Sequence, residues 1–174
     1  MKKRDFLHSA AAGALGLSLP AAFASGAAKS DAAKKKFVLK GVDAFGKPVK
    51  LEDHKGKAVL VSFFTVECIP CTNDMRLMRE FYGENKAKNF INIGVNVDAD
   101  KQSLADYVDL MRLTIPLKQH FPIAWRGAKG HTDNFGPLTS NPTHFVLDPE
   151  HRLITRRNGI FKGEDWDELW TSLQ

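Results

Sequence analysis

Cys68 and Cys71 are the only two cysteines among the 174 residues, and they stand two residues apart in the stretch FFTVECIPCTNDM (63–75). Two thiols at this spacing can close a disulfide and reopen it by exchange with a partner disulfide. A purely structural disulfide is a poor explanation, because so small a closed loop stabilises a fold only slightly. The alternative from another functional class is a chaperone that binds copper or another metal through the same thiols and a histidine.

A metal site of that kind needs histidines to complete it. The candidates are His120, His131, His144 and His151. We expect each of them to be a surface or loop histidine, and we therefore predict no metal site and no cofactor.

The two cysteines stand where an expected strand gives way to an expected helix. Residues 58–64 form a nearly continuous apolar run, which is typical of a central strand buried on both faces. Met75, Met78 and Tyr82 then follow Cys71 at steps of four, three and four. This spacing places Cys71 on the buried side of a helix.

The position of the pair at a helix start predicts a division of labour between the thiols. Free N–H groups and a partial positive charge at a helix N-terminus stabilise a thiolate. We expect Cys68 to be exposed, with its thiol pKa below that of a free cysteine, and Cys71 to resolve the mixed disulfide. Pro70 suits the first helical turn, where no N–H is needed.

The rest of the chain alternates strand and helix patterns. We expect a hairpin around 46–48, a strand over 91–97, a helix through 104–111 that begins with a Ser103–Asp106 capping box, strands over 143–147 and 153–155, and a closing helix over 166–173. This order predicts an α/β fold, a mixed sheet with helices on both of its faces.

The first residues carry an export signal rather than fold. Lys2, Lys3 and Arg4 precede a short apolar stretch that ends at a small-x-small site, so we predict a cleaved signal peptide over 1–24, twin-arginine-like or Sec. Residues 25–36 read as a flexible linker, a tether near the membrane, and 37–174 as one domain. We therefore expect a periplasmic protein. The net charge of +5 is too small to indicate a nucleic-acid partner.

Four stretches give the chain from 37 to 174 a family resemblance. They read GKPVKLEDHKGKAVLVSFFTVECIPC, INIGVNVDAD, LTIPLKQHFPI and SNPTHFVLDPEHRLITRRNG. With these, the chain resembles the thioredoxin-fold proteins, and among them the exported TlpA-like thiol-disulfide oxidoreductases. LTIPLKQHFPI corresponds to an insert that precedes the cis-proline hairpin in this branch.

The resemblance implies roles for particular residues and partners. Pro142 corresponds to the cis-proline that packs beside Cys68, and it would act with Cys68 and Cys71 in catalysis. Glu67, Ile69, Pro70 and Asn141 would contact the partner chain. The partners would be proteins with disulfides or thiols, reduced by the enzyme, and a membrane electron donor would recycle it.

The chain departs from the family pattern around the cysteines. Glu67 stands where a Trp is usual, Thr72 replaces a basic residue, and Arg76 replaces a proline. Ser62 occupies the position of thioredoxin's buried acid, so we expect no obvious buried base for Cys71. Two other enzyme classes are rivals, an oxidant of the DsbA type and a peroxidase. The first would need a helical domain after Asp98, and the second an arginine to match Thr65.

Overall fold

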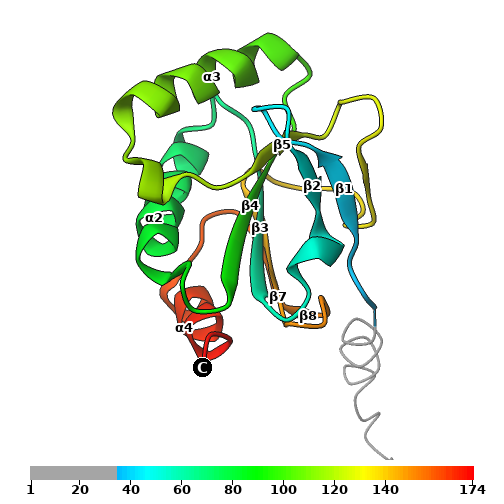
Figure 1. Cartoon of the computed structure of the whole chain (residues 1–174), viewed down its shortest axis with the longest axis vertical. Helices are drawn as coiled ribbons and strands as arrows, with labels where there is room; N and C mark the ends of the chain where they lie inside the picture. The colour runs from blue at the N-terminus through cyan, green and yellow to red at the C-terminus, as the bar shows by residue number, and fades with distance from the viewer. Residues whose placement is uncertain (1–34) are drawn as a thin grey trace, which may run out of the picture.

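The computed structural model describes residues 35–174 (Figure 1). The predicted signal peptide (1–24) and residues 25–34 of the predicted linker lie outside the described residues. Within residues 35–174, no helix has the length and apolar character needed to cross a membrane.

A five-stranded mixed sheet forms the centre of the domain. In spatial order its strands are β5 (Ile123–Trp125), β4 (Phe90–Asn96), β3 (Ala58–Phe64), β7 (Thr143–Leu147) and β8 (Leu153–Asn158). β3, β4 and β5 run parallel, whereas β7 is antiparallel to β3 and β8 is antiparallel to β7. Every residue of β3 is buried, which confirms the central strand predicted from the apolar run. The sequence pattern did not reveal β5.

A second, three-stranded sheet covers one face of the first. It contains β2 (Pro48–Lys50), β1 (Leu39–Val42) and the two-residue β6 (Thr132–Asp133), with β1 in the middle. β1 and β2 form the predicted hairpin. Aromatic rings fill the space between the two sheets, since Phe37 and Phe135 pack on Phe63 or Phe145 of the central strands.

Three α-helices and two short 3-10 helices complete the domain. They are η1 (Leu51–His54), α2 (Ile69–Asn85), α3 (Lys101–Thr114), η2 (Leu117–Gln119) and α4 (Gly163–Thr171). The predicted capping box at the start of α3 is wrong. Asp100 caps this helix instead, because its side chain accepts hydrogen bonds from the N–H groups of Gln102 and Ser103.

The sequence had suggested helices on both faces of the central sheet, but the three α-helices all lie on one face. Successive strand residues point to opposite faces, and Ser62 and Phe64 share the face opposite Phe63. Ser62 contacts Met78 of α2, and Phe64 contacts Tyr107 of α3. In Figure 1, α2 and α4 lie on one side of the sheet and the small sheet on the other.

The undetected strand β5 explains this arrangement. The chain passes from β3 to β4 and from β4 to β5 in the same direction across the sheet. Right-handed crossovers that advance in one direction place both connecting helices on one face. α2 and α3 are therefore neighbours, and Arg79 of α2 donates a 2.7 Å hydrogen bond to the hydroxyl of Tyr107.

Candidate active site

The two cysteines form a disulfide at the start of α2. Their sulfur atoms are 2.09 Å apart and their Cα atoms 5.1 Å apart. Cys68 is the N-cap of the helix, and its sulfur accepts a 3.2 Å hydrogen bond from the backbone N–H of Cys71. Cys68 is partly exposed, whereas Cys71 is only 1% exposed. An attacking partner can therefore reach the sulfur of Cys68 and not that of Cys71.

The residues around Cys68 form a small exposed surface. Glu67 and Pro70 are exposed, and the side chain of Ile69 is 84% exposed. Pro70 stands in the first turn of α2, where the missing N–H costs no hydrogen bond. These three predicted partner-binding residues thus surround the reachable sulfur.

Pro142 lies at the same end of the sheet as the disulfide. The Asn141–Pro142 peptide bond is cis, as the resemblance implied. Thr143 pairs with Phe63 near the end of β3, so Pro142 stands just beyond the strand that leads to Cys68. Pro142 is buried and Asn141 is exposed. The hydroxyl of Thr143 donates a 2.6 Å hydrogen bond to the carbonyl of Ser140, which holds this loop.

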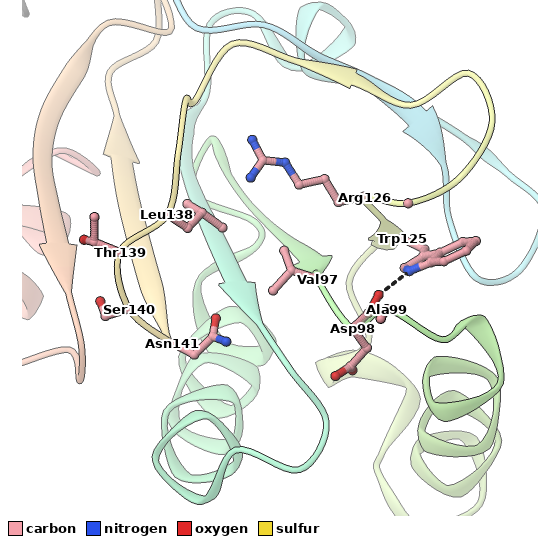
Figure 2. A pocket seen from close by; sticks show the side chains of 10 residues that line it. Val97, Asp98, Ala99, Trp125, Arg126, Leu138, Thr139, Ser140 and Asn141 are labelled. Carbon is pink, nitrogen blue, oxygen red and sulfur yellow. Dashed lines mark hydrogen bonds between the residues drawn. The ribbon is translucent and has the colours of Figure 1, made fainter.

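An open cleft of about 830 Å³ runs beside this loop (Figure 2). Asn141 and its neighbours form one wall, and Trp125 and Arg126 form the opposite wall. The cleft lies at the carboxyl ends of β4 and β5, where open parallel sheets place their binding sites. Asn141, which directly precedes the cis-proline Pro142, is therefore part of the cleft wall.

Asp98 lines the cleft and is hydrogen-bonded to the loop that precedes Cys68. Its carboxylate accepts hydrogen bonds from the backbone N–H of Val66 (2.9 Å) and from the side-chain amide of Asn96 (2.6 Å). Its carbonyl accepts a 2.8 Å hydrogen bond from the indole N–H of Trp125. Asp98 therefore connects the end of β4, the wall of the cleft and the loop that presents Cys68.

A charged cluster stands behind the cleft wall at Arg126. The guanidinium of Arg126 forms two hydrogen bonds with the carboxylate of Asp133, and the ring of His131 lies 3.0 Å from the same carboxylate. Burial would raise the pKa of Asp133, but the hydrogen bonds from His131 and Arg126 outweigh it and lower the pKa to about 2. Arg126 also lies over the ring of Phe63, 5.1 Å from its centroid.

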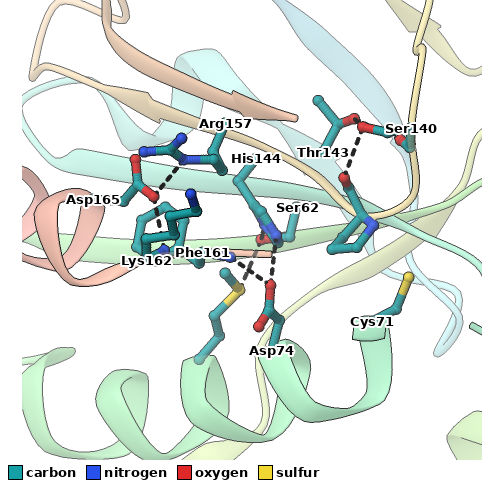
Figure 3. Close-up of polar contacts among 12 residues, drawn as sticks. Ser62, Cys71, Asp74, Ser140, Thr143, His144, Arg157, Phe161, Lys162 and Asp165 are labelled. Carbon is teal, nitrogen blue, oxygen red and sulfur yellow. Dashed lines mark hydrogen bonds and ion pairs between the residues drawn. The ribbon is translucent and has the colours of Figure 1, made fainter. Parts of the chain in front are cut away.

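A buried polar network lies between α2 and the strands β3 and β7 (Figure 3). One imidazole nitrogen of His144, Nε2, is 3.1 Å from the carboxylate of Asp74, and Nδ1 is 3.1 Å from the hydroxyl of Ser62. The backbone N–H of Phe161 donates a 2.8 Å hydrogen bond to the same carboxylate oxygen of Asp74. His144 and Asp74 are only 1% and 2% exposed.

This network corrects two expectations. His144 is not a surface or loop histidine, because β7 is a central strand and all of its residues are buried. A buried titratable group also does lie near Cys71, since Asp74 follows it by three residues on the buried face of α2.

The other three candidate histidines lie in loops and differ in how far they are buried. His131 and His151 lie in loops, as expected, although the side chain of His131 is only 2% exposed and His151 only 6%. His120 is partly buried and contacts the carbonyl of Ile115. Residues 35–174 contain no group of three His, Cys, Asp or Glu side chains that could hold a metal ion.

Sequence reasoning missed Asp98, the Asp74–His144 pair and the Arg126–Asp133 cluster. A signal for the pair was present. Asp74 falls on the stripe of Cys71 and Met75, and His144 falls inside a run expected to be a strand. Asp98 and Arg126 carried no such signal, because both lie just after strand ends, where polar residues are common.

Comparisons with known proteins agree with this geometry. The sequence profile of the AhpC/TSA family matches residues 30–156. The chain is 30% identical over 146 residues to a thiol-disulfide oxidoreductase ResA of Bacillus cereus, and the match covers 83% of this chain and 79% of the relative. It is also 30% identical over 138 residues to the thiol-disulfide oxidoreductase ResA of Geobacillus kaustophilus, covering 79% and 74%.

A solved structure extends the likeness to the fold. A thiol:disulfide interchange protein of the thioredoxin family from Chlorobium tepidum TLS superposes with a TM-score of 0.64 at 21% identity. The match covers 80% of this chain and 95% of that protein. The domain therefore has the thioredoxin-like fold that the sequence predicted.

Proposed function

We propose a reductive role for this protein, which belongs to the AhpC/TSA family and is a thiol-disulfide oxidoreductase with Cys68 and Cys71 as its redox pair. The contrast between a reachable Cys68 and a buried Cys71 at one helix start carries the roles of the two thiols, and the resemblance to exported TlpA-like oxidoreductases supports the reductive direction. The reduced protein donates electrons to disulfides of partner proteins and ends as the disulfide form.

In the proposed cycle Cys68 is the nucleophile. Its thiolate attacks a partner disulfide, forms a mixed disulfide and releases one partner sulfur as a thiolate. Cys71 then attacks the sulfur of Cys68, closes the intramolecular disulfide and releases the second partner sulfur. The partner gains two electrons, which the enzyme's dithiol loses.

Pro142 and Asn141 position the partner in this proposal. Pro142 is buried beside the end of β3 and shapes the surface next to Cys68. Asn141 is exposed on the cleft wall, where its backbone groups can pair with an extended partner chain. Glu67, Ile69 and Pro70 supply the other side of the contact, since all three are exposed around the sulfur.

The protein works outside the cytoplasm in this proposal, and a membrane electron donor returns it to the dithiol form. The support is the signal-like pattern of residues 1–24, with basic residues, a short apolar stretch and a small-residue cleavage site. A labelled chain recovered from the periplasm without residues 1–24 supports this location, and a full-length chain in the cytoplasm contradicts it.

Two measurements test the proposed function. The reduced protein should accelerate the reduction of insulin, and Cys68→Ser and Cys71→Ser should each remove turnover. The reduction potential, measured against glutathione, should lie nearer that of thioredoxin, about −270 mV, than that of DsbA, about −120 mV. A potential near the second value would reverse the proposed direction. Cys71→Ala should then trap partners as mixed disulfides in cells, and Cys68→Ala, the matched control, should trap none.

A further inference from the structure

The buried network below the disulfide joins three elements through one histidine. His144 of β7 lies between Ser62 of β3 and Asp74 of α2, with 3.1 Å on each side. Within residues 35–174, the hydrogen bonds to the Asp74 carboxylate, from Phe161 N–H and from His144, both reach Oδ2, and none reaches Oδ1. Figure 3 shows Asp74 and Cys71 projecting from the same side of α2.

The hydroxyl of Ser62 can serve this network in two ways. It lies 3.1 Å from Nδ1 of His144 and 3.1 Å from the sulfur of Met78, and it has one hydrogen to donate. With a neutral imidazole, Ser62 donates to Nδ1 and Nε2–H donates to Asp74. With one more proton on the ring, Nδ1–H donates to Ser62, whose hydroxyl turns to Met78. Both ring nitrogens of His144 therefore have a hydrogen-bond partner, whether the imidazole is neutral or carries one more proton.

The attack of Cys71 on Cys68 needs a nearby group that can accept the proton of the Cys71 thiol. Cys71 is 1% exposed, and burial disfavours the thiolate that must attack Cys68. Little water reaches the thiol to take its proton. Asp74 stands three residues along α2 on the same buried face, and this spacing places the two Cβ atoms about 5–6 Å apart.

We propose that His144 is a positioning residue for the resolving step, and that its imidazole, held between Ser62 and Asp74, lets the buried Asp74–His144 pair take up and return the proton of Cys71. The proton leaves the Cys71 thiol for the pair. The remaining electron pair on sulfur forms the bond to Cys68, and the bond between Cys68 and the partner breaks onto the partner sulfur. Reduction of the enzyme disulfide runs in reverse, and the pair returns the proton to Cys71.

Other charged groups face His144 from the neighbouring elements. Arg157 of β8 is its direct neighbour across the strand pair, and Arg157 is held by Asp165 and Glu164 of α4. Lys162, just before α4, donates its backbone N–H to Asp165. The positive charge of Arg157 is thus matched by carboxylates of its own, which leaves Asp74 as the carboxylate bonded to His144.

The inference rests on the proposed function, and one experiment separates the two. Reduced protein is mixed with the aromatic disulfide dithiobis(nitrobenzoate), and release of coloured thionitrobenzoate is followed over a range of pH. The first release reports the attack by Cys68, and the second reports the attack by Cys71. The reagent replaces the partner, so no natural substrate is needed.

His144→Gln is the informative variant. Its amide can still donate to Asp74 and accept from Ser62, but it cannot bind a proton near neutral pH. We expect the second release to slow about 100-fold at neutral pH, the usual scale of general acid–base catalysis. The difference should shrink as pH rises, because hydroxide then removes the Cys71 proton. Ser62→Ala should slow the same release less, and the control His120→Gln should leave both releases unchanged.

Each outcome of this experiment either supports or overturns the inference. A slower second release with a new pH profile and an unchanged first release supports the inference. An unchanged second release in His144→Gln overturns it, and so does equal slowing of both releases, which would mean a structural role alone. If the unmutated protein gives no first release, the proposed function fails, and the inference fails with it.

Discussion

The carboxylate of Asp98 accepts a hydrogen bond from the backbone N–H of Val66, with 2.9 Å between Oδ2 and N. Val66 stands two residues before Cys68, in the loop between β3 and α2, and Asp98 stands two residues after β4. The contact therefore holds in place the loop that presents the reactive sulfur. A charged acceptor makes this hydrogen bond stronger than a neutral one would be.

Asp98→Ala should slow the exchange reaction of Cys68. The change leaves the N–H of Val66 without its partner, which costs about 1–3 kcal/mol of stability and loosens the loop. Thermal unfolding measures the first effect, and the rate of the first thionitrobenzoate release measures the second. Asp100→Ala is the matched control, because it removes the cap of α3 at a cost of about 1 kcal/mol without touching the loop. Equal exchange rates in the two variants would remove Asp98 from any role in presenting Cys68.

In the reduced protein, Cys68 should react with iodoacetamide well before Cys71. The reason is access, since Cys68 is partly exposed and Cys71 is 1% exposed. Mass mapping after a brief pulse of label gives the order of modification, and a fully unfolded sample, in which both thiols should react alike, serves as the control. If Cys71 carries the label first, the assignment of nucleophile and resolving thiol is wrong.

The sequence predicted those parts of the fold in which local pattern and burial agree. The apolar run of 58–64 became the central strand, and the stripe of Cys71, Met75 and Met78 became the buried face of α2. The hairpin β1–β2 also followed from its turn residues. In each case the chain's own periodicity carried the information, so one sequence was enough.

The predictions that were wrong or incomplete concern features that depend on contacts between distant segments of the chain. β5 is only three residues long, too short for a period to show, and it decides on which face α3 lies. His144 is polar by type, and only its place in a central strand buries it. Asp100 replaced Ser103 as the cap of α3 because both residues are good caps within three positions of each other. Tertiary structure settled each of these choices.

Acid should destabilise the protein partly through Asp133. Its pKa is lowered from 3.8 to about 2 in the folded state, so the folded state favours the carboxylate more than the unfolded chain does. The stabilisation is complete above about pH 4 and is lost as pH falls through about 2. The side chain of Asp133 is only 4% exposed, but that of Arg126 is 28% exposed, so water screens part of the attraction. The shift therefore corresponds to at most about 2 kcal/mol.

Asp133→Asn tests this assignment. Urea unfolding at pH 5 should show a loss of at most about 2 kcal/mol relative to the unmutated protein, and the two proteins should converge as pH approaches 2. Asp109→Asn is the control, because Asp109 is 74% exposed and its nearest cation, Arg112, is 3.9 Å away. A constant difference between Asp133→Asn and the unmutated protein at every pH would show that the carboxylate's charge is not the cause.

Glu67→Gln should lower the pKa of the Cys68 thiol in the reduced protein. Glu67 precedes Cys68 directly, and a neighbouring negative charge disfavours a thiolate. Glu67 is exposed, so water screens the effect, and we expect a change of at most about 0.7 pKa units, in line with exposed charge pairs. Because the charge penalises the reduced, thiolate-bearing form, its removal should also make the enzyme more reducing, by at most about 20 mV, wherever Cys68 is ionised.

The ultraviolet absorbance of the thiolate against pH measures the pKa, with Glu84→Gln at the far end of α2 as the control for a lost surface charge. An unchanged or higher pKa in Glu67→Gln would mean that the carboxylate points away from the sulfur, and the residue would then affect partner contact alone.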